Sequence, residues 1–141
     1  MVTVNYLAVL ACAVLSMIIG TIWYGPMFGK KWMQITGSDK FDEQKRKEMQ
    51  KSAMPLYGIQ FVLSLIQAYI LAQYVVIGSL IDISGVMNGF LIWLAFVMPT
   101  VAGSSMWNAN SNKIKWAQFY IQAGYQLVLF LVFGALLIAW K

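Results

Sequence analysis

The sequence contains very few of the residues that carry chemistry. Its 141 residues include no histidine, a single cysteine and only five acidic residues. The lone Cys12 cannot form an internal disulfide, and without histidine there is no Cys/His framework for a metal ion. General acid–base and nucleophilic catalysis need an imidazole, a carboxylate or an activated thiol. We therefore expect no enzyme, no catalytic residue, no metal and no cofactor.

Charge is scarce as well. Only 11% of the residues are charged and 60% are hydrophobic, whereas an ordinary soluble domain is about a quarter charged. This composition excludes a soluble domain, a disordered tail and a nucleic-acid-binding module as the main description of the chain. The sequence instead belongs to a small integral membrane protein.

Four long stretches contain no Asp, Glu, Lys or Arg at all. A helix of roughly 20 apolar residues crosses a bilayer, and continuously apolar stretches indicate helices, because barrel strands alternate in polarity. The sequence predicts an all-α, polytopic four-helix membrane bundle. It forms a single transmembrane domain over residues 1–141, with spans at about 2–23, 55–77, 83–105 and 116–140.

The basic residues lie almost entirely at one end of this predicted bundle. Loops rich in Lys and Arg stay in the cytoplasm, so we expect both termini outside and a multi-pass protein of the cell (inner or cytoplasmic) membrane. Membrane lipids are then its expected partners. Because membrane orientation accounts for the excess of basic residues, we expect no nucleic-acid partner. Nine of the ten basic residues are at this end, and Lys141 is at the other: Lys30, Lys31, Lys40, Lys45, Arg46, Lys47, Lys51, Lys113 and Lys115.

The long basic segment between the first two spans has its own predicted structure. Gly25 and Pro26 end the first span. Acidic residues then precede basic ones over about residues 39–53, which is the favourable order for a helix dipole. We expect a short helix there, lying on the cytoplasmic surface and leading into the second span at Pro55. This helix either binds anionic lipid or only fixes the orientation.

Two further features concern the ends and the regularity of the spans. Pro99 removes a backbone hydrogen bond, so we expect a kink near Ala95, and the Gly85-x-x-x-Gly89 spacing permits a close helix approach. Most tryptophans and Tyr24 lie where interfacial anchors are expected. These anchors are Trp23, Tyr24, Trp32, Trp107, Trp116 and Trp140.

Uncharged polar residues recur at helical spacing inside the spans. An amide that faces lipid would leave its donors and acceptors unpaired, so these faces should meet one another or a partner chain. They either join the helices of a structural or accessory bundle, as a single chain or as a homo-oligomer, or line a vestibule in the cytoplasmic half. In the second case the protein is a passive channel or a binding site for an unspecified small neutral solute or lipid. The candidate lining residues are Gln60, Ser64, Gln67, Thr100, Ser104, Gln118, Gln122, Tyr125 and Gln126.

Several motifs resemble a domain-of-unknown-function family of small four-span prokaryotic membrane proteins. The family's Trp-Tyr-x-Pro and Phe-Gly-Lys-x-Trp elements match Trp23, Tyr24, Pro26, Phe28, Gly29 and Trp32. Its Asp-Ala-Gly-Tyr-His element resembles residues 122–126, where Gln122 and Gln126 replace the acid and the imidazole. The resemblance implies the four-span fold and no particular reaction. It also implies that any site at these two positions is electrically neutral here.

Overall fold

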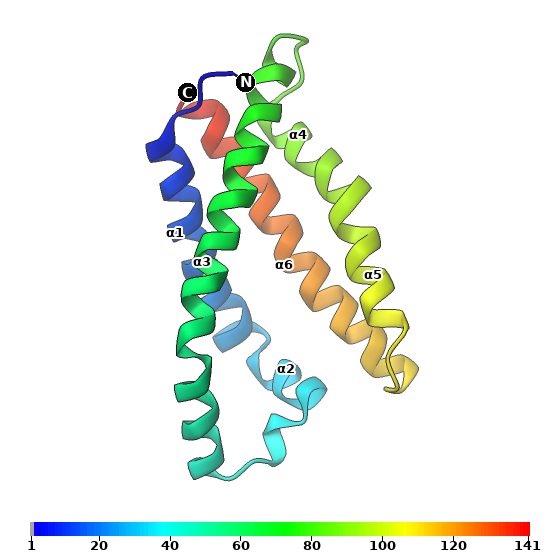
Figure 1. The fold of residues 1–141 in the computed structure, drawn as a ribbon. Helices are drawn as coiled ribbons and strands as arrows, with labels where there is room; N and C mark the ends of the chain where they lie inside the picture. The colour runs from blue at the N-terminus through cyan, green and yellow to red at the C-terminus, as the bar shows by residue number, and fades with distance from the viewer. Residues whose placement is uncertain (1) are drawn as a thin grey trace.

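The computed structural model describes residues 2–141, which form helices joined by short turns (Figure 1). Four of the helical stretches are long and apolar enough to cross a membrane, as predicted: residues 6–27, 43–79, 85–106 and 112–139. Both termini lie at the same end of the bundle. In chain order the elements are α1 (Tyr6–Ile22), the π-helical segment η1 (Trp23–Met27), α2 (Gly29–Thr36), the 3₁₀ turn η2 (Ser38–Lys40), α3 (Glu43–Ser79), α4 (Gly85–Ile92), the π-helical segment η3 (Trp93–Val97), α5 (Met98–Met106) and α6 (Asn112–Ala139).

The segment between the first two spans differs from the prediction. The short helix that separates them is α2, whereas the expected helix over residues 39–53 is not a separate element. Instead α3 begins at Glu43, capped by the Asp42 carboxylate, which accepts a hydrogen bond from the Lys45 N–H at 2.8 Å. It then runs unbroken through Pro55. The carbonyl that Pro55 leaves without a partner is near the exposed end of α3, where water can satisfy it.

The ends of the first span also differ from the prediction. The helix begins at Tyr6 because the Asn5 side chain caps it, accepting hydrogen bonds from the N–H groups of Leu7 and Ala8. At the other end the Gly25–Pro26 pair does not stop the helix. The backbone widens into the π turn η1, which contains Pro26 and continues to Met27.

The third span contains a matching irregularity, close to where it was predicted. The π-helical segment η3 is centred on Ala95 and directly precedes α5, whose second residue is Pro99. Proline has no N–H to donate to the carbonyl four residues earlier, and here the turn before Pro99 is π-helical instead of α-helical.

The core of the bundle is near the two termini. Helix α6 is its centre, since it contacts α1, α3, α4 and α5. Cys12, Leu71, Val75, Leu129 and Phe133 are fully buried where these helices meet. This end of the molecule is therefore closed by tightly packed apolar side chains.

Glycines bring α4 and α6 together inside one chain. A Cβ atom added at Gly85 would collide with the carbonyl oxygen of Gly134, and one added at Gly134 would collide with that of Gly85. A Cβ at Gly89 would likewise meet the Phe130 carbonyl. The Gly85-x-x-x-Gly89 spacing thus serves packing within the bundle.

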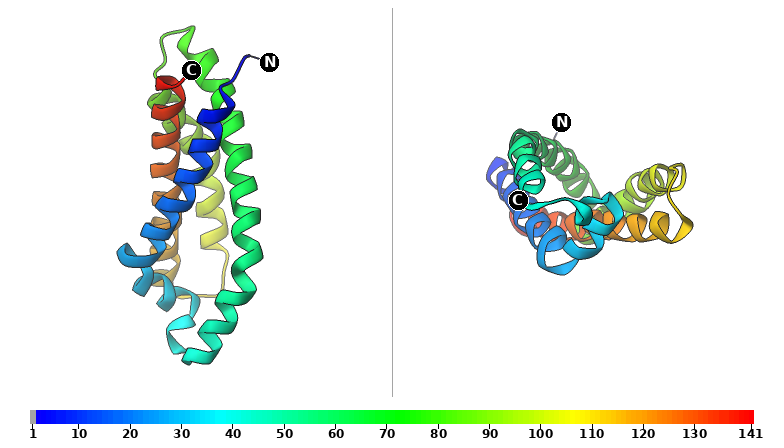
Figure 2. Two further views of the ribbon diagram at one scale, coloured as in Figure 1. Left: turned by 90° about the vertical axis from the view of Figure 1, so that its left-hand side faces the viewer. Right: turned by 90° about the horizontal axis from the view of Figure 1, so that it is seen from below.

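At the basic end the helices diverge. Helices α5 and α6 run together, while the basic half of α3 lies well to the side of α5 (Figure 1). Seen from below, the α5–α6 hairpin extends away from α1 and α3 (Figure 2). The bundle is therefore closed at the end that carries the termini and open at the end that carries the lysines.

Candidate functional site

A cavity of about 760 Å³ occupies the open end of the bundle. It lies between α1 with η1, α3, α5 and α6, and none of its lining residues is charged. Those residues are Ser16, Met17, Gly20, Thr21, Tyr24, Gly25, Ala53, Leu56, Tyr57, Gln60, Val101, Ser104, Gln122, Tyr125 and Gln126.

Five of the nine residues proposed from the sequence to line a vestibule are part of this wall. They come from three helices that are distant in sequence. Gln60 belongs to α3, Ser104 to α5, and Gln122, Tyr125 and Gln126 to α6. The periodicity of each helix face was visible in the sequence, but their convergence on one cavity depends on how the helices pack.

The other four proposed residues lie elsewhere. Ser64 and Gln67 lie deeper along α3, where Ser64 is fully buried. The Thr100 hydroxyl donates to the Phe96 carbonyl of its own span at 2.6 Å. Gln118 accepts a hydrogen bond from the Asn108 side chain at 3.3 Å and thereby joins the two sides of the α5–α6 turn.

The cavity amides have unused hydrogen-bonding capacity. The Gln126 side-chain oxygen is buried and accepts no hydrogen bond from any residue between 2 and 141, and the same holds for the Gln67 oxygen. A buried amide oxygen without a donor costs about 1–3 kcal/mol. An amide that joined two segments would have its partner on the neighbouring segment, as Gln118 of α6 has in Asn108 of the α5–α6 turn.

Tyr125 forms the wall of the cavity on the α1 side. Its hydroxyl donates to the Ser16 carbonyl at 2.9 Å, a buried bond between α6 and α1. Gly20 leaves room for this ring, since a Cβ there would lie 3.0 Å from the Tyr125 oxygen. The Tyr24 ring packs edge-on against the Tyr125 ring, with 5.3 Å between ring centroids.

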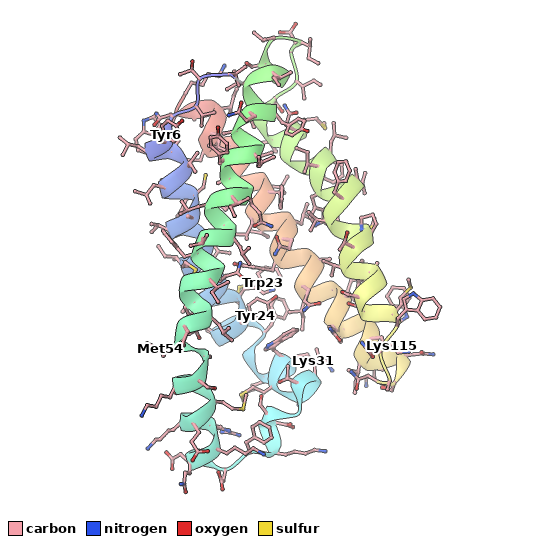
Figure 3. All side chains as sticks on the ribbon, in the orientation of Figure 1. Tyr6, Trp23, Tyr24, Lys31, Met54 and Lys115 are labelled. Atoms are coloured by element: carbon pink, nitrogen blue, oxygen red, sulfur yellow. The ribbon has the colours of Figure 1, made fainter. Side chains whose placement is uncertain are left out.

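The remaining motif aromatics surround this pair. Trp23 donates its indole N–H to the Ile121 carbonyl of α6 at 3.0 Å, and its ring centroid is 4.8 Å from that of Phe28. The Tyr24 ring is 5.0 Å from the Trp32 ring. Trp23 and Tyr24 lie between the α3 and α6 ribbons in Figure 3. The two motif elements thus form one aromatic cluster, which comprises Trp23, Tyr24, Phe28, Trp32 and Tyr125.

Trp23 and Tyr24 do more than the sequence interpretation as interfacial anchors implies. Both are partly buried against the core of the bundle, and their rings pack on Tyr125. Trp107, in contrast, is 89% exposed and Trp116 is 50% exposed. An isolated sequence position does not distinguish a tryptophan at the bundle end from one that turns inward.

Sequence reasoning missed Trp93. This residue begins η3 as Trp23 begins η1, and its indole N–H donates to the Ala123 carbonyl of α6 at 3.0 Å. The two tryptophans therefore bond to α6 only two residues apart. The available signal was the depth of Trp93 within an apolar span, where an indole N–H needs a partner.

Comparison with known proteins identifies a family for this chain. A family model described as a protein of unknown function (DUF1761) matches residues 7–138. No curated protein and no solved structure matches the chain.

Proposed function

The chain belongs to DUF1761, a family of proteins of unknown function, and from that premise we propose that it is a multi-pass membrane protein that binds a small uncharged ligand in the polar cavity. The observation that carries this proposal concerns Gln126, a residue of the cavity wall whose buried side-chain oxygen has no hydrogen-bond donor within residues 2–141. A ligand that donates a hydrogen bond to this oxygen would remove the free-energy cost of leaving it unpaired.

The lining sets the chemistry of this ligand. Gln60, Gln122 and Gln126 each offer a carbonyl oxygen and an NH₂ group, so they suit a molecule with both donors and acceptors. Met17 and Leu56 add apolar surface. A charged ligand would be buried without a counter-charge, at high cost. The volume of about 760 Å³ is within the range of small-molecule sites.

The shape of the bundle favours binding over passage through a single chain. The cavity is at the open end, and the packed core around Leu71, Leu129 and Phe133 lies between it and the other end. A purely structural role for the amides is supported less well, because only Gln118 among those on α6 has a side-chain partner on a neighbouring segment. An enzymatic role is supported less well, since the residues that line the cavity include no carboxylate, imidazole, amine or thiol.

Native mass spectrometry of the protein released from nanodiscs tests the proposal. The wild type should carry an adduct of defined mass. Gln126→Leu should reduce the adduct about tenfold, because it removes a hydrogen bond from a buried ligand. The ligand-free variant should unfold at the same or a higher temperature, since its unpaired oxygen is gone.

Gln118→Leu is the matched control on the same helix. It breaks the bond with Asn108 and should lower the unfolding temperature slightly, but it leaves the cavity and the adduct unchanged. The proposal fails if the wild type carries no adduct, or if both variants lose it together with stability.

The distribution of lysines supports placing the open end in the cytoplasm and both termini outside. Single cysteines introduced by Lys40→Cys or Lys141→Cys, in a Cys12→Ala background, would report this orientation through an impermeant maleimide applied to spheroplasts. Only position 141 should react before the membrane is opened. If only position 40 reacted, the orientation would be the opposite of the one proposed.

A further inference from the structure

A second, smaller pocket lies in the α5–α6 hairpin and shares no lining residue with the polar cavity. Its volume is about 240 Å³. Ser105 of α5 lines it from one side, and Asn112, Lys115 and Trp116 of α6 line it from the other. The adjoining wall is apolar and includes Met106 and Phe119.

Ser105 contributes a hydroxyl that has no partner. The residue is only 1% exposed, and its Oγ accepts or donates no hydrogen bond within residues 2–141. Its backbone carbonyl is already engaged, since it accepts a hydrogen bond from the Asn108 side chain at 2.8 Å. Ser105 is thus a residue of the pocket wall whose buried hydroxyl has no hydrogen-bond partner within residues 2–141.

The start of α6 adds positive potential to the same pocket. The Ser111 side chain accepts from the Ile114 N–H, so the N–H groups of Asn112 and Lys113 are left without an intrahelical acceptor. The dipole of this 28-residue helix points its positive end here. Lys113 and Lys115 add two charges, and the sequence from residue 83 to the C-terminus contains no acidic residue.

We propose that this pocket binds a phosphate group. Phosphate oxygens accept hydrogen bonds from a hydroxyl, from free helix N–H groups and from a lysine ammonium, and Ser105, the α6 N-terminus and Lys115 supply these three kinds of donor. Lys115 lies beside the α5–α6 turn at the open end of the bundle (Figure 3). The basic residues near α2 differ, because four acidic residues between 39 and 48 offset them.

An anionic phospholipid headgroup and free inorganic phosphate both carry this chemistry. The experiment uses the full chain in nanodiscs of phosphatidylcholine with a minor share of phosphatidylglycerol, followed by native mass spectrometry. One phosphatidylglycerol retained in preference to phosphatidylcholine assigns the pocket to a lipid. Its displacement by excess inorganic phosphate, with phosphate retained instead, assigns the pocket to the soluble ion. Retention of neither overturns the proposal.

Three variants separate a built site from general attraction. Lys115→Gln should lower retention of the phosphate-bearing species about fivefold, the effect of one lysine near an anionic group. Ser105→Ala should lower it several-fold while leaving the unfolding temperature in pure phosphatidylcholine unchanged. Lys113→Gln removes the same charge from the same turn but outside the lining, so its effect should be clearly smaller than that of Lys115→Gln. Equal losses in the two lysine variants, or no loss with Ser105→Ala, would overturn the proposal.

Discussion

Gly134→Val is expected to disrupt the packing of α4 on α6 and to lower the unfolding temperature of the bundle strongly. Gly134 and Gly85 contact each other through their backbones, and a side chain at either would collide with the carbonyl oxygen of the other. A backbone contact cannot yield as a flexible side chain can, so the helices must separate. Overpacking typically costs about 1–3 kcal/mol, and a collision with backbone atoms should lie at the upper end of that range. Thermal unfolding in detergent, followed by circular dichroism, measures the loss.

Gly103→Ala is the matched control. Gly103 lies in the third span, as Gly85 does, but a Cβ atom added at Gly103 meets nothing within 4 Å. Because alanine favours a helix over glycine by about 0.5–1 kcal/mol, this variant should be as stable as the wild type or slightly more so. Similar losses in both variants would mean that the α4–α6 contact is not the reason.

Trp23→Ala is expected to have the second largest effect. It removes the hydrogen bond to the Ile121 carbonyl and the ring that packs against Phe28 and Tyr125. Loss of a fully buried large aromatic side chain costs about 3–5 kcal/mol. Because Trp23 is partly buried, its loss should cost an amount near the lower end of that range. Unfolding by heat in detergent should show the decrease. The aromatic side of the polar cavity should loosen as well, so the ligand adduct proposed above should diminish.

Two further variants identify which lost interaction lowers the stability of Trp23→Ala. Trp107→Ala removes an equally large ring that is 89% exposed, and it should change the stability by no more than about 0.5 kcal/mol. Trp23→Phe keeps most of the ring but loses the N–H donor, so it should cost about 1 kcal/mol. If Trp23→Phe were as damaging as Trp23→Ala, the hydrogen bond rather than the ring packing would hold the cluster together.

The spans could be predicted from the sequence because they depend on a local property, the length of an uncharged run. The position of Trp23 could not. Whether an indole at the end of a span faces lipid or turns inward is decided by Gly124 on another helix, where a Cβ would lie 3.1 Å from the Trp23 ring. No pattern within residues 2–23 contains that information.

Some of the residues that line the candidate cavity could likewise be predicted from the sequence. Helical spacing placed Gln122 and Gln126 on one face of α6, and that inference needs only the helix repeat. It also grouped Gln118 with them, although Gln118 bonds to Asn108 at the turn. Which amides border a cavity depends on the divergence of α3 from α5, a property of the whole bundle.

The start of α3 was predicted incorrectly for a different reason. Pro55 and the charge pattern around residues 39–53 indicated a boundary, but the structure has one helix across it. Proline interrupts a helix only when its environment cannot satisfy the freed carbonyl. Whether that carbonyl lies in lipid or near water is a matter of depth, which the sequence pattern alone did not give.

The two π turns have a consequence for how such a cavity can change during evolution. A π turn holds one more residue than the α-helical turn it replaces, and one residue corresponds to about 100° of rotation around a helix. The single extra residue in η3 therefore determines the direction in which Val101 and Ser104 of α5 point. Loss or gain of one residue in η3 would turn a different face of α5 toward the cavity. The lining would then change although no amino acid in α5 had been substituted. A change in chain length at η3 would thus alter the lining of the cavity without any amino-acid substitution at the cavity itself.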